Sequence, residues 1–324
     1  MKRLLLAITA ACLVTTMPVT PVHAQEWPQR TIKISIGFGA GGGTDIVGRI
    51  IAQRMQEKFG QAVVVENKPG AGGALAANDV ARAEPDGHTL LMMANAHIIV
   101  GVMSKSLPYD TLKSFLPVSQ LATAGLIIVT RPDFPASDVK GLVAAAKADP
   151  GKITFASVGA GSTQHFTGEL FKQAAGVDML HIPFRRSPEA IAAVLGKQVD
   201  VLFDTVSAVL GQVQSGDLKP LAVTGKDRFP AVPNVPAAVE SGVVPGYEVT
   251  TWYGMLAPLG TPPAVVAKLN KTLNEIIAEP DVRERMSKAG VIAKGGTPEE
   301  FAKHMESELV RWGAVREKAG LEQR

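Results

Sequence analysis

Gly37-Phe38-Gly39-Ala40-Gly41-Gly42-Gly43-Thr44-Asp45 is the stretch that decides the fold. An apolar run typical of a strand, Thr31–Ile36, precedes it, and a run with the apolar spacing of a helix, Asp45–Phe59, follows it. Glycine permits the sharp turn between the two and leaves backbone N–H groups uncovered. The first turn of the helix adds N–H groups without intrahelical partners, at the positive end of the helix dipole. This stretch therefore predicts an anion-binding loop.

A second glycine loop repeats this arrangement further along the chain. It reads Ser157-Val158-Gly159-Ala160-Gly161-Ser162-Thr163-Gln164-His165, after the apolar run Ile153–Ala156 and before an amphipathic run that ends near Ala175. The hydroxyl groups of Ser162 and Thr163 suit the N-terminus of such a helix, where they can cap it or also reach a ligand. We interpret the two stretches as anion-binding loops that face each other across one ligand site.

The pattern around the two loops predicts two α/β lobes. Strand-like and helix-like runs alternate with short turns, which is typical of a parallel sheet with helices on its faces. The alternation starts again near Leu121, and 324 residues exceed the size at which one core usually keeps growing. The proline-rich stretch Phe229–Pro236 predicts an irregular return to the first lobe. We expect lobe 1 to comprise residues 25–125 and 248–324, lobe 2 to comprise residues 126–247, and each lobe to have a mostly parallel sheet.

Two helix starts carry recognisable capping residues. Ser137 can cap a helix that runs to Ala148. Thr297-Pro298-Glu299-Glu300 has the pattern of a capping box with proline at the first helical position. The pair Trp252-Tyr253 is expected to pack between the lobes.

The first 24 residues have the three parts of a secretory signal peptide. Lys2 and Arg3 form the basic start, Leu4–Val14 the apolar stretch, and Val22-His23-Ala24 the small-residue end, so cleavage is expected after Ala24. The apolar stretch is shorter than the ~20 residues that a membrane span requires. The single cysteine, Cys12, lies within this segment, so we expect no disulfide in the secreted chain.

The charge and the histidines exclude several classes of partner. The formal net charge is +3, and removal of residues 1–24 takes away Lys2 and Arg3 without any acid, which leaves +1. This balance gives no support for binding to nucleic acid or to a membrane surface. The histidines after residue 24 show no metal-ligand spacing. We expect a monomer without metal or cofactor.

Two enzyme interpretations remain open at this point. The run Gly37–Gly42 fits the dinucleotide-binding pattern G-x-G-x-x-G, and Glu66 ends the next strand about where an acid that binds ribose would lie. Secretion away from cytosolic NAD, and a loop that continues through Gly43, weigh against an oxidoreductase. Ser162 and His165 could serve a serine hydrolase, although residues three apart at a helix start usually have capping roles.

Four candidate residues each have two interpretations. Asp45 either compensates the dipole of its helix or lies beside a carboxylate that the glycines hold. His165 is expected to shape its loop rather than to touch the ligand. Arg186 is either a solvated cation on a turn or a counter-charge for the ligand. Asp204, at the end of a strand, either caps the next helix or accepts a hydrogen bond from ligand or water.

These motifs, in this order, resemble those of the substrate-binding proteins of tripartite tricarboxylate transporters, the Bug or TctC family. The resemblance rests on both glycine loops and on the segments Glu66–Gly73, Pro85–Leu91, Gly168–Phe171 and Gly196–Asp200. It covers essentially the whole chain after residue 24. It implies a two-lobed α/β periplasmic binding protein, type II-like, with the ligand cleft between the lobes.

The resemblance also implies a function. A protein of this kind captures a small carboxylated ligand, closes by a hinge, and delivers the ligand to a tripartite tricarboxylate-type membrane permease. A secreted carboxylate sensor for a signalling partner is the alternative with the same architecture. Together, the resemblance and the residue patterns predict the ligand-binding residues Phe38, Ala40, Gly41, Gly42, Thr44, Asp45, Ser157, Gly159, Gly161, Ser162, Thr163, His165, Arg186 and Asp204.

The chain departs from the family pattern at two places. Gly39 stands where proline or alanine is common. Phe184-Arg185-Arg186-Ser187 replaces the usual tyrosine, basic residue and glycine, and so puts a long cation, Arg186, where the backbone is normally bare. If Arg186 points into the cleft, we expect a second acidic group on the ligand; if it points outward, it says nothing about the ligand.

Overall fold

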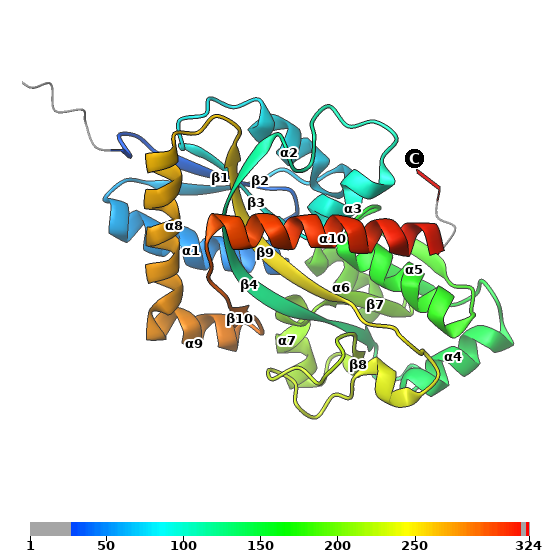
Figure 1. Ribbon diagram of the computed structural model, residues 1–324. Coiled ribbons are helices and arrows are strands. Elements are labelled where there is room, and N and C mark those ends of the chain that lie inside the picture. Colours follow the sequence, from blue (N-terminus) through cyan, green and yellow to red (C-terminus); the bar gives the residue numbers. More distant parts are fainter. Residues whose placement is uncertain (1–26, 319–321, 324) are drawn as a thin grey trace, which may run out of the picture.

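The computed structural model describes residues 27–318 and 322–323 and shows an α/β protein (Figure 1). The strands are β1 (Ile32–Ile36), β2 (Val63–Asn67), β3 (Thr89–Ala94), β4 (Phe115–Thr130), β5 (Thr154–Ser157), β6 (Leu180–Pro183), β7 (Val201–Thr205), β8 (Lys219–Val223), β9 (Thr250–Pro258) and β10 (Ile292–Ala293). The α-helices are α1 (Gly43–Phe59), α2 (Ala74–Ala81), α3 (Ala96–Met103), α4 (Val139–Ala148), α5 (Thr163–Ala175), α6 (Ser187–Leu195), α7 (Val206–Ser215), α8 (Pro263–Ala278), α9 (Pro280–Lys288) and α10 (Pro298–Lys318). Two short 3-10 helices are η1 (Ala71–Gly73) and η2 (Ala238–Ser241). The predicted signal peptide, with Cys12 and the cleavage site, lies outside the described residues.

One mixed sheet runs through the molecule in the order β2-β1-β3-β9-β4-β7-β5-β6, and β8 and β10 also pair with β4. The outer strands are parallel, as predicted: β1 pairs with β2 and β3, and β5 pairs with β6 and β7. The central pairs β3–β9, β9–β4 and β4–β7 are antiparallel, which the alternation of strands and helices did not indicate. The reason is topological, because β4 leaves the first half of the molecule and β9 returns to it in the opposite direction.

Strand β4 belongs to both halves of the sheet. Residues 115–125 pair with β9, whereas residues 126–130 pair with β7 and β8. Figure 1 shows β4 and β9 side by side, running from the part of the molecule with β1–β3 toward the part with β7 and β8. The predicted lobe boundary at residues 125 and 126 falls where β4 changes partners.

Hydrophobic packing fixes the end of the strand that precedes each glycine loop. The isoleucines of β1 are completely buried and share one hydrophobic cluster with Val47, Ile51 and Met55 of α1. In the other half, Phe155 of β5 is buried against Phe203 of β7, with ring centroids 5.6 Å apart. Burial of each such side chain contributes about 1.5–3 kcal/mol. The backbone at Gly37 and at Ser157 is therefore held at the edge of a rigid sheet.

The helix starts lie close to the predictions, although α1 begins at Gly43, two residues before the expected Asp45. Helix α5 begins at Thr163 and ends at Ala175. The predicted capping box is present at the start of α10: Glu300 N donates to Thr297 Oγ1 at 3.2 Å, and Thr297 N donates to Glu300 Oε2 at 2.9 Å. The expected cap of α4, Ser137, is wrong. The helix begins at Val139, so its cap position is Asp138, whose carboxylate accepts from Gly141 N at 2.7 Å.

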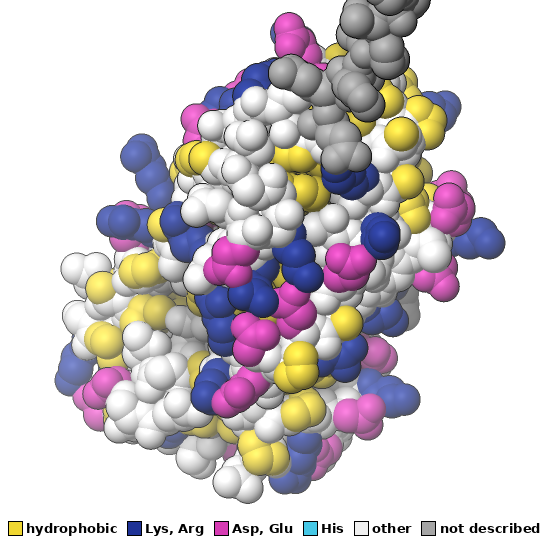
Figure 2. Space-filling view, turned by 90° about the vertical axis from the view of Figure 1, so that its left-hand side faces the viewer, with side chains coloured by type: hydrophobic (Ala, Val, Ile, Leu, Met, Phe, Trp, Pro, Cys, Tyr) yellow, Lys and Arg dark blue, Asp and Glu magenta, His cyan; other side chains and the backbone are white. Residues whose placement is uncertain are grey.

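The surface is mixed in charge on the face shown in Figure 2. On the coloured part of this face, Lys and Arg side chains are interspersed with Asp and Glu rather than forming a basic area. Ion pairs such as Lys58–Glu279, at 2.9 Å, and Lys288–Glu284, at 2.6 Å, match this pattern. Within residues 27–318 and 322–323, no helix has the length and apolar character needed to cross a membrane.

Candidate functional site

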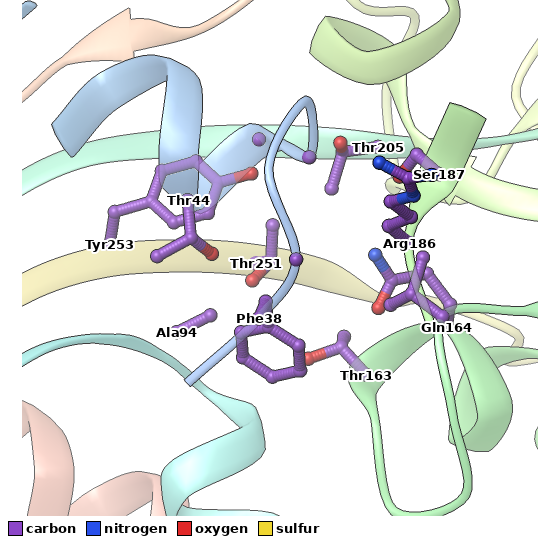
Figure 3. A pocket seen from close by; sticks show the side chains of 14 residues that line it. Phe38, Thr44, Ala94, Thr163, Gln164, Arg186, Ser187, Thr205, Thr251 and Tyr253 are labelled. Atoms are coloured by element: carbon purple, nitrogen blue, oxygen red, sulfur yellow. The ribbon is translucent and has the colours of Figure 1, made fainter. Parts of the chain in front are cut away.

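A pocket lies where the two glycine loops meet, and four helices begin at its wall. The first residues or N-caps of α1 (Gly42, Gly43), α5 (Thr163), α6 (Ser187) and α7 (Thr205) all line it. Figure 3 shows Thr44 and Tyr253 on one side, Gln164, Arg186 and Ser187 on the other, and Phe38 between them. The full lining is Phe38, Gly39, Gly42, Gly43, Thr44, Ala94, Val158, Thr163, Gln164, Arg186, Ser187, Thr205, Thr251 and Tyr253.

The electrostatics of this wall favour an anion. The N-terminus of each helix carries about half a positive charge from the aligned peptide dipoles, and its first N–H groups have no partner inside the helix. Across the described residues, no carbonyl or side chain accepts a hydrogen bond from the N–H groups of Gly43, Thr44, Thr163 or Gln164. A carboxylate in the pocket would find donors on both sides.

The two halves of the molecule are in close contact around the pocket. A Cβ atom added to Gly39 would lie 2.6 Å from Cβ of Arg186 and 2.9 Å from the carbonyl oxygen of Arg185. The pocket and its mouth hold about 390 Å³ of space outside the protein atoms, but the centre of a water molecule can move through only about 20 Å³ of it. That is room for about one or two water molecules.

Asn95, at the N-cap of α3, connects three segments behind the pocket. Its side-chain oxygen accepts from Thr163 Oγ1 at 2.6 Å and from Thr251 Oγ1 at 2.7 Å, and its amide donates to the carbonyl of Thr250 at 3.1 Å. Asn95 is completely buried. Because a buried amide must have its hydrogen bonds satisfied, this network fixes how the start of α5 lies against β9.

Asp45 stabilises the first glycine loop from within. Its buried carboxylate accepts from Gly41 N at 3.0 Å, from Asn67 Nδ2 at 3.0 Å and from Arg49 Nη2 at 2.9 Å. Burial alone would raise the pKa of Asp45, but the hydrogen bonds from Arg49, Gly41 and Asn67 hold it below its ordinary value. The carboxylate therefore stays charged and occupies the N–H group of Gly41, which is not available to a ligand in this conformation.

The second glycine loop is supported by two stacked histidines. The rings of His165 and His181 are 4.0 Å apart between centroids, and His181 Nε2 lies 2.7 Å from Ser157 Oγ. Gly161 N donates to His165 Nδ1 at 3.3 Å, and His165 N donates to Ser162 Oγ, the N-cap of α5. These residues set the shape of the loop from behind the pocket.

Asp204 is a buried carboxyl group at the end of β7. Gln164 Nε2 donates to its Oδ1 at 3.0 Å and Thr205 N at 2.8 Å, so Asp204 orients two residues that line the pocket. Burial raises the pKa of Asp204, and the nearby Ser187 hydroxyl, Gln164 and the Thr205 N–H only partly offset this. Within the described chain, Oδ2 of Asp204 and Oγ of Ser187 make no hydrogen bond of normal geometry.

The predicted site residues occupy three kinds of position. Phe38, Gly42, Thr44, Thr163 and Arg186 line the pocket. Gly159 lines a neighbouring cavity that shares Phe38 with the pocket. The others lie beside or behind it: Ala40 is exposed on the first glycine loop, and the loops are supported by Gly41, Asp45, Ser157, Gly161, Ser162, His165 and Asp204.

Several lining residues were not predicted. Ser187 and Thr205 each stand where a strand gives way to a helix, and the rule applied to the two glycine loops would have found them at two further strand-to-helix turns. Thr251 and Tyr253 come from β9, far along the chain. The Tyr253 hydroxyl is buried among Gly43, Thr205 and Ser207 and makes no hydrogen bond of normal geometry in the described part of the chain. Burial raises the pKa of Tyr253, so its neutral O–H can donate to a ligand.

Comparison with known proteins identifies the family. The family model TctC, described as tripartite tricarboxylate transporter family receptor, matches residues 47–321. The chain belongs to this family. This TctC-family protein is 36% identical to a UPF0065 protein from the tcbD-tcbE intergenic region of Pseudomonas sp. (strain P51), over 96% of the chain and 92% of that relative. It is 34% identical to protein BugT of Bordetella pertussis, and the match covers 97% of each of the two chains.

Solved structures confirm the fold class. The periplasmic binding protein BugD is 37% identical with a TM-score of 0.88, and the match covers 92% of the present TctC-family chain and 100% of BugD. R. palustris Rpa4515, solved with adipate, is 30% identical with a TM-score of 0.88 over 92% and 99% of the two chains. MatC (Rpa3494) from Rhodopseudomonas palustris, solved with bound malate, is 33% identical with a TM-score of 0.85 over 89% and 99%. The TctC-family chain is thus an α/β periplasmic binding protein with a solute-binding role.

The enzyme interpretations of the glycine loops are not favoured. The first loop is covered by the turn that carries Arg185 and Arg186, where a dinucleotide would need open space. Glu66, the candidate ribose-binding acid, forms an ion pair with Lys33 at 3.4 Å. Ser162 is completely buried, and its hydroxyl accepts the His165 N–H as the cap of α5, which does not suit a nucleophile.

Proposed function

We propose that this protein captures a small carboxylate between lobe 1 (residues 25–125 and 248–324) and lobe 2 (residues 126–247) and delivers it to a tripartite tricarboxylate-type membrane permease. The observation that carries the proposal is the convergence of four helix N-termini on one pocket. The bound adipate of Rpa4515 and the bound malate of MatC support a carboxylate ligand for this chain.

The proposed mechanism is binding without chemistry, so the protein is not an enzyme. The ligand carboxylate accepts hydrogen bonds from backbone N–H groups at the starts of α1 and α5, and the hydroxyl groups of Ser187 and Tyr253 lie close enough to the pocket to add to them. With the ligand bound, the lobes close about β4 and β9, the strands that continue from one half to the other. Closure removes water from the pocket and strengthens each of these hydrogen bonds.

The remaining parts of the proposal concern location and assembly. We propose that the protein is exported, is cleaved after Ala24, and acts in the periplasm as a monomer. The membership of the chain in a transporter receptor family supports the permease as its partner rather than a signalling protein. Deletion of the gene for this protein in cells that express the permease tests delivery. If the protein delivers the ligand, uptake of the radiolabelled ligand falls; if it is a sensor, uptake stays unchanged.

Thermal unfolding against a panel of ligands tests the binding function. The panel holds mono-, di- and tricarboxylates, the amide of each acid, and NAD. A ligand that binds only the native state stabilises it by about 2.7 kcal/mol at a hundredfold excess over its Kd, which is a shift of several degrees in Tm. We expect stabilisation by at least one acid and not by its amide. Stabilisation by NAD alone would overturn the proposal in favour of a dinucleotide site.

A further inference from the structure

A second cavity lies beside the pocket and shares Phe38 and Val158 with it. It is much roomier than the pocket, because the centre of a water molecule can move through about 430 Å³ of it. The turn and 3-10 helix at residues 69–73 form one wall, and Gly159, Ala160 and Phe184 form much of the other. We call it the side chamber. Its walls bring segments from both halves of the molecule together, as those of the pocket do.

The wall of the side chamber is apolar except for one positively charged residue. Most of it is apolar or backbone, with the side chains of Phe38 and Phe184 as its largest groups. Among the described residues that line it, Arg185 alone is charged. A cation beside apolar walls favours a ligand with an apolar middle and an acidic end.

The two neighbouring arginines differ in their partners. Arg186 Nε donates to Glu189 Oε1 at 2.7 Å, and Arg186 lines the pocket. The guanidinium of Arg185 makes no ion pair or hydrogen bond within the part of the chain that the structure describes; only its backbone N–H reaches Glu189, at 3.4 Å. Glu189 is the carboxylate next to both arginines, and it forms its ion pair with Arg186. The positive charge of Arg185 is therefore left for a ligand carboxylate to neutralise.

We propose that the ligand is a linear dicarboxylate that occupies both cavities, and that Arg185, not Arg186, recognises its second carboxylate. One carboxylate binds at the four helix starts, the carbon chain passes Phe38 and Val158, and the far carboxylate reaches Arg185 in the side chamber. This inference rests on the proposed function, because it requires the first carboxylate to bind at the helix starts. It assigns to Arg185 the role that the sequence suggested for its neighbour.

The length of the ligand is part of this inference. An acid too short to pass Phe38 leaves Arg185 without a partner and gains little from its second carboxylate. An acid too long must bend within the side chamber or extend into solvent, which costs conformational entropy. Affinity along a series of straight-chain dicarboxylates is therefore expected to pass through a maximum, whereas affinity along the matching monocarboxylates is not.

The test is isothermal titration with straight-chain dicarboxylates of three to eight carbons and with the monocarboxylates of equal length. The purified wild type is compared with Arg185→Gln and with a control that carries both Arg186→Gln and Glu189→Gln, so that Glu189 cannot pair with Arg185 instead. We expect Arg185→Gln to weaken the best dicarboxylate about ten- to hundredfold, as for the loss of a charge-assisted hydrogen bond, and to leave monocarboxylates within about twofold. The control variant should leave the ratio of the two affinities unchanged.

Three outcomes would overturn the inference. Arg185→Gln weakens both classes equally, the control variant shows the selective loss, or the wild type binds both classes alike. Each of these leaves the proposed function standing, because a carboxylate still binds. Absence of binding by every acid in the series overturns this inference, and the proposed function falls with it if the acids of the wider panel, tricarboxylates included, also fail to bind.

A second variant tests the side chamber without touching either arginine. Ala160 lines the chamber and is exposed, so Ala160→Phe adds bulk at its wall without replacing a buried side chain. We expect the optimum of the dicarboxylate series to move to a shorter acid and the binding of short monocarboxylates to stay within about twofold. An unchanged optimum would show that the far end of the ligand lies elsewhere.

Discussion

Thr163 Oγ1 donates a hydrogen bond of 2.6 Å to Asn95 Oδ1 and so joins the start of α5 to the start of α3 behind the ligand pocket. Both residues are buried, and they belong to opposite lobes of the proposed two-lobed molecule. A hydrogen bond between lobes exists only while the lobes are together. It therefore stabilises the closed form without touching the ligand.

Thr163→Val is expected to weaken ligand binding by about two- to tenfold. The variant keeps the shape of the side chain and removes a hydrogen bond whose net contribution is about 0.5–1.5 kcal/mol, and that loss shifts the population toward the open form. Titration gives the affinity, and small-angle scattering with and without ligand gives the fraction closed. Thr251→Val is the control, since Thr251 also donates to Asn95, at 2.7 Å, but lies on β9. Equal effects of the two variants on closure would contradict a specific role of the Thr163–Asn95 hydrogen bond in stabilising the closed form.

Gly43→Ala is expected to prevent full closure, whereas Gly42→Ala is not. Across the lobe boundary, a Cβ on Gly43 would lie 2.7 Å from Ser207 Oγ and 2.9 Å from Thr205 Oγ1, but a Cβ on Gly42 would meet nothing nearer than 3.6 Å. Overpacking of this kind costs about 1–3 kcal/mol in the closed form, so affinity should fall about five- to hundredfold. Titration of both variants, with circular dichroism to verify folding, gives the comparison. Equal affinities would show that the start of α1 does not need to approach the start of α7 for the ligand to bind.

Asp204→Asn is expected to stabilise the protein at neutral pH. A carboxyl group whose pKa is raised above 3.8 by burial binds its proton more tightly in the native state, so the free energy of unfolding falls as pH rises from 3.8 through the native pKa. The loss amounts to at most about 1.4 kcal/mol for each pH unit in that interval. The asparagine oxygen can still accept from Gln164 and Thr205. Urea unfolding between pH 4 and pH 8 should show the gain growing with pH; a less stable variant at pH 7 would refute this.

His97 is expected to make the protein less stable in mild acid. Burial lowers the pKa of His97 to about 4, and its hydrogen bond to the Thr111 carbonyl offsets this only in part. The unfolded chain therefore binds a proton that the native state does not, and about 3 kcal/mol of stability is lost as pH falls from 6.5 to about 4. In His97→Gln, the slope of unfolding free energy against pH should decrease over this interval. An unchanged slope would assign the acid sensitivity to other groups.

The local pattern of residues determined the building blocks of this protein. Both transitions from strand through glycine to helix, the bounds of α5 and the capping box at Thr297 were predictable, because glycine conformations and helix caps depend on residues within one turn of each other. The family and its solute-binding role followed from the same motifs.

Only the tertiary structure decided how these blocks form a site. Strand β9 enters the sheet between β3 and β4 and brings Thr251 and Tyr253 to the pocket from more than 200 residues beyond the first glycine loop. Two further helix starts, at Ser187 and Thr205, complete the wall. The choice of Arg186 rather than Arg185 as the partner of Glu189 depends on the geometry of one turn. Contacts of this kind come from the packing of distant segments, and a linear pattern does not record which segments meet.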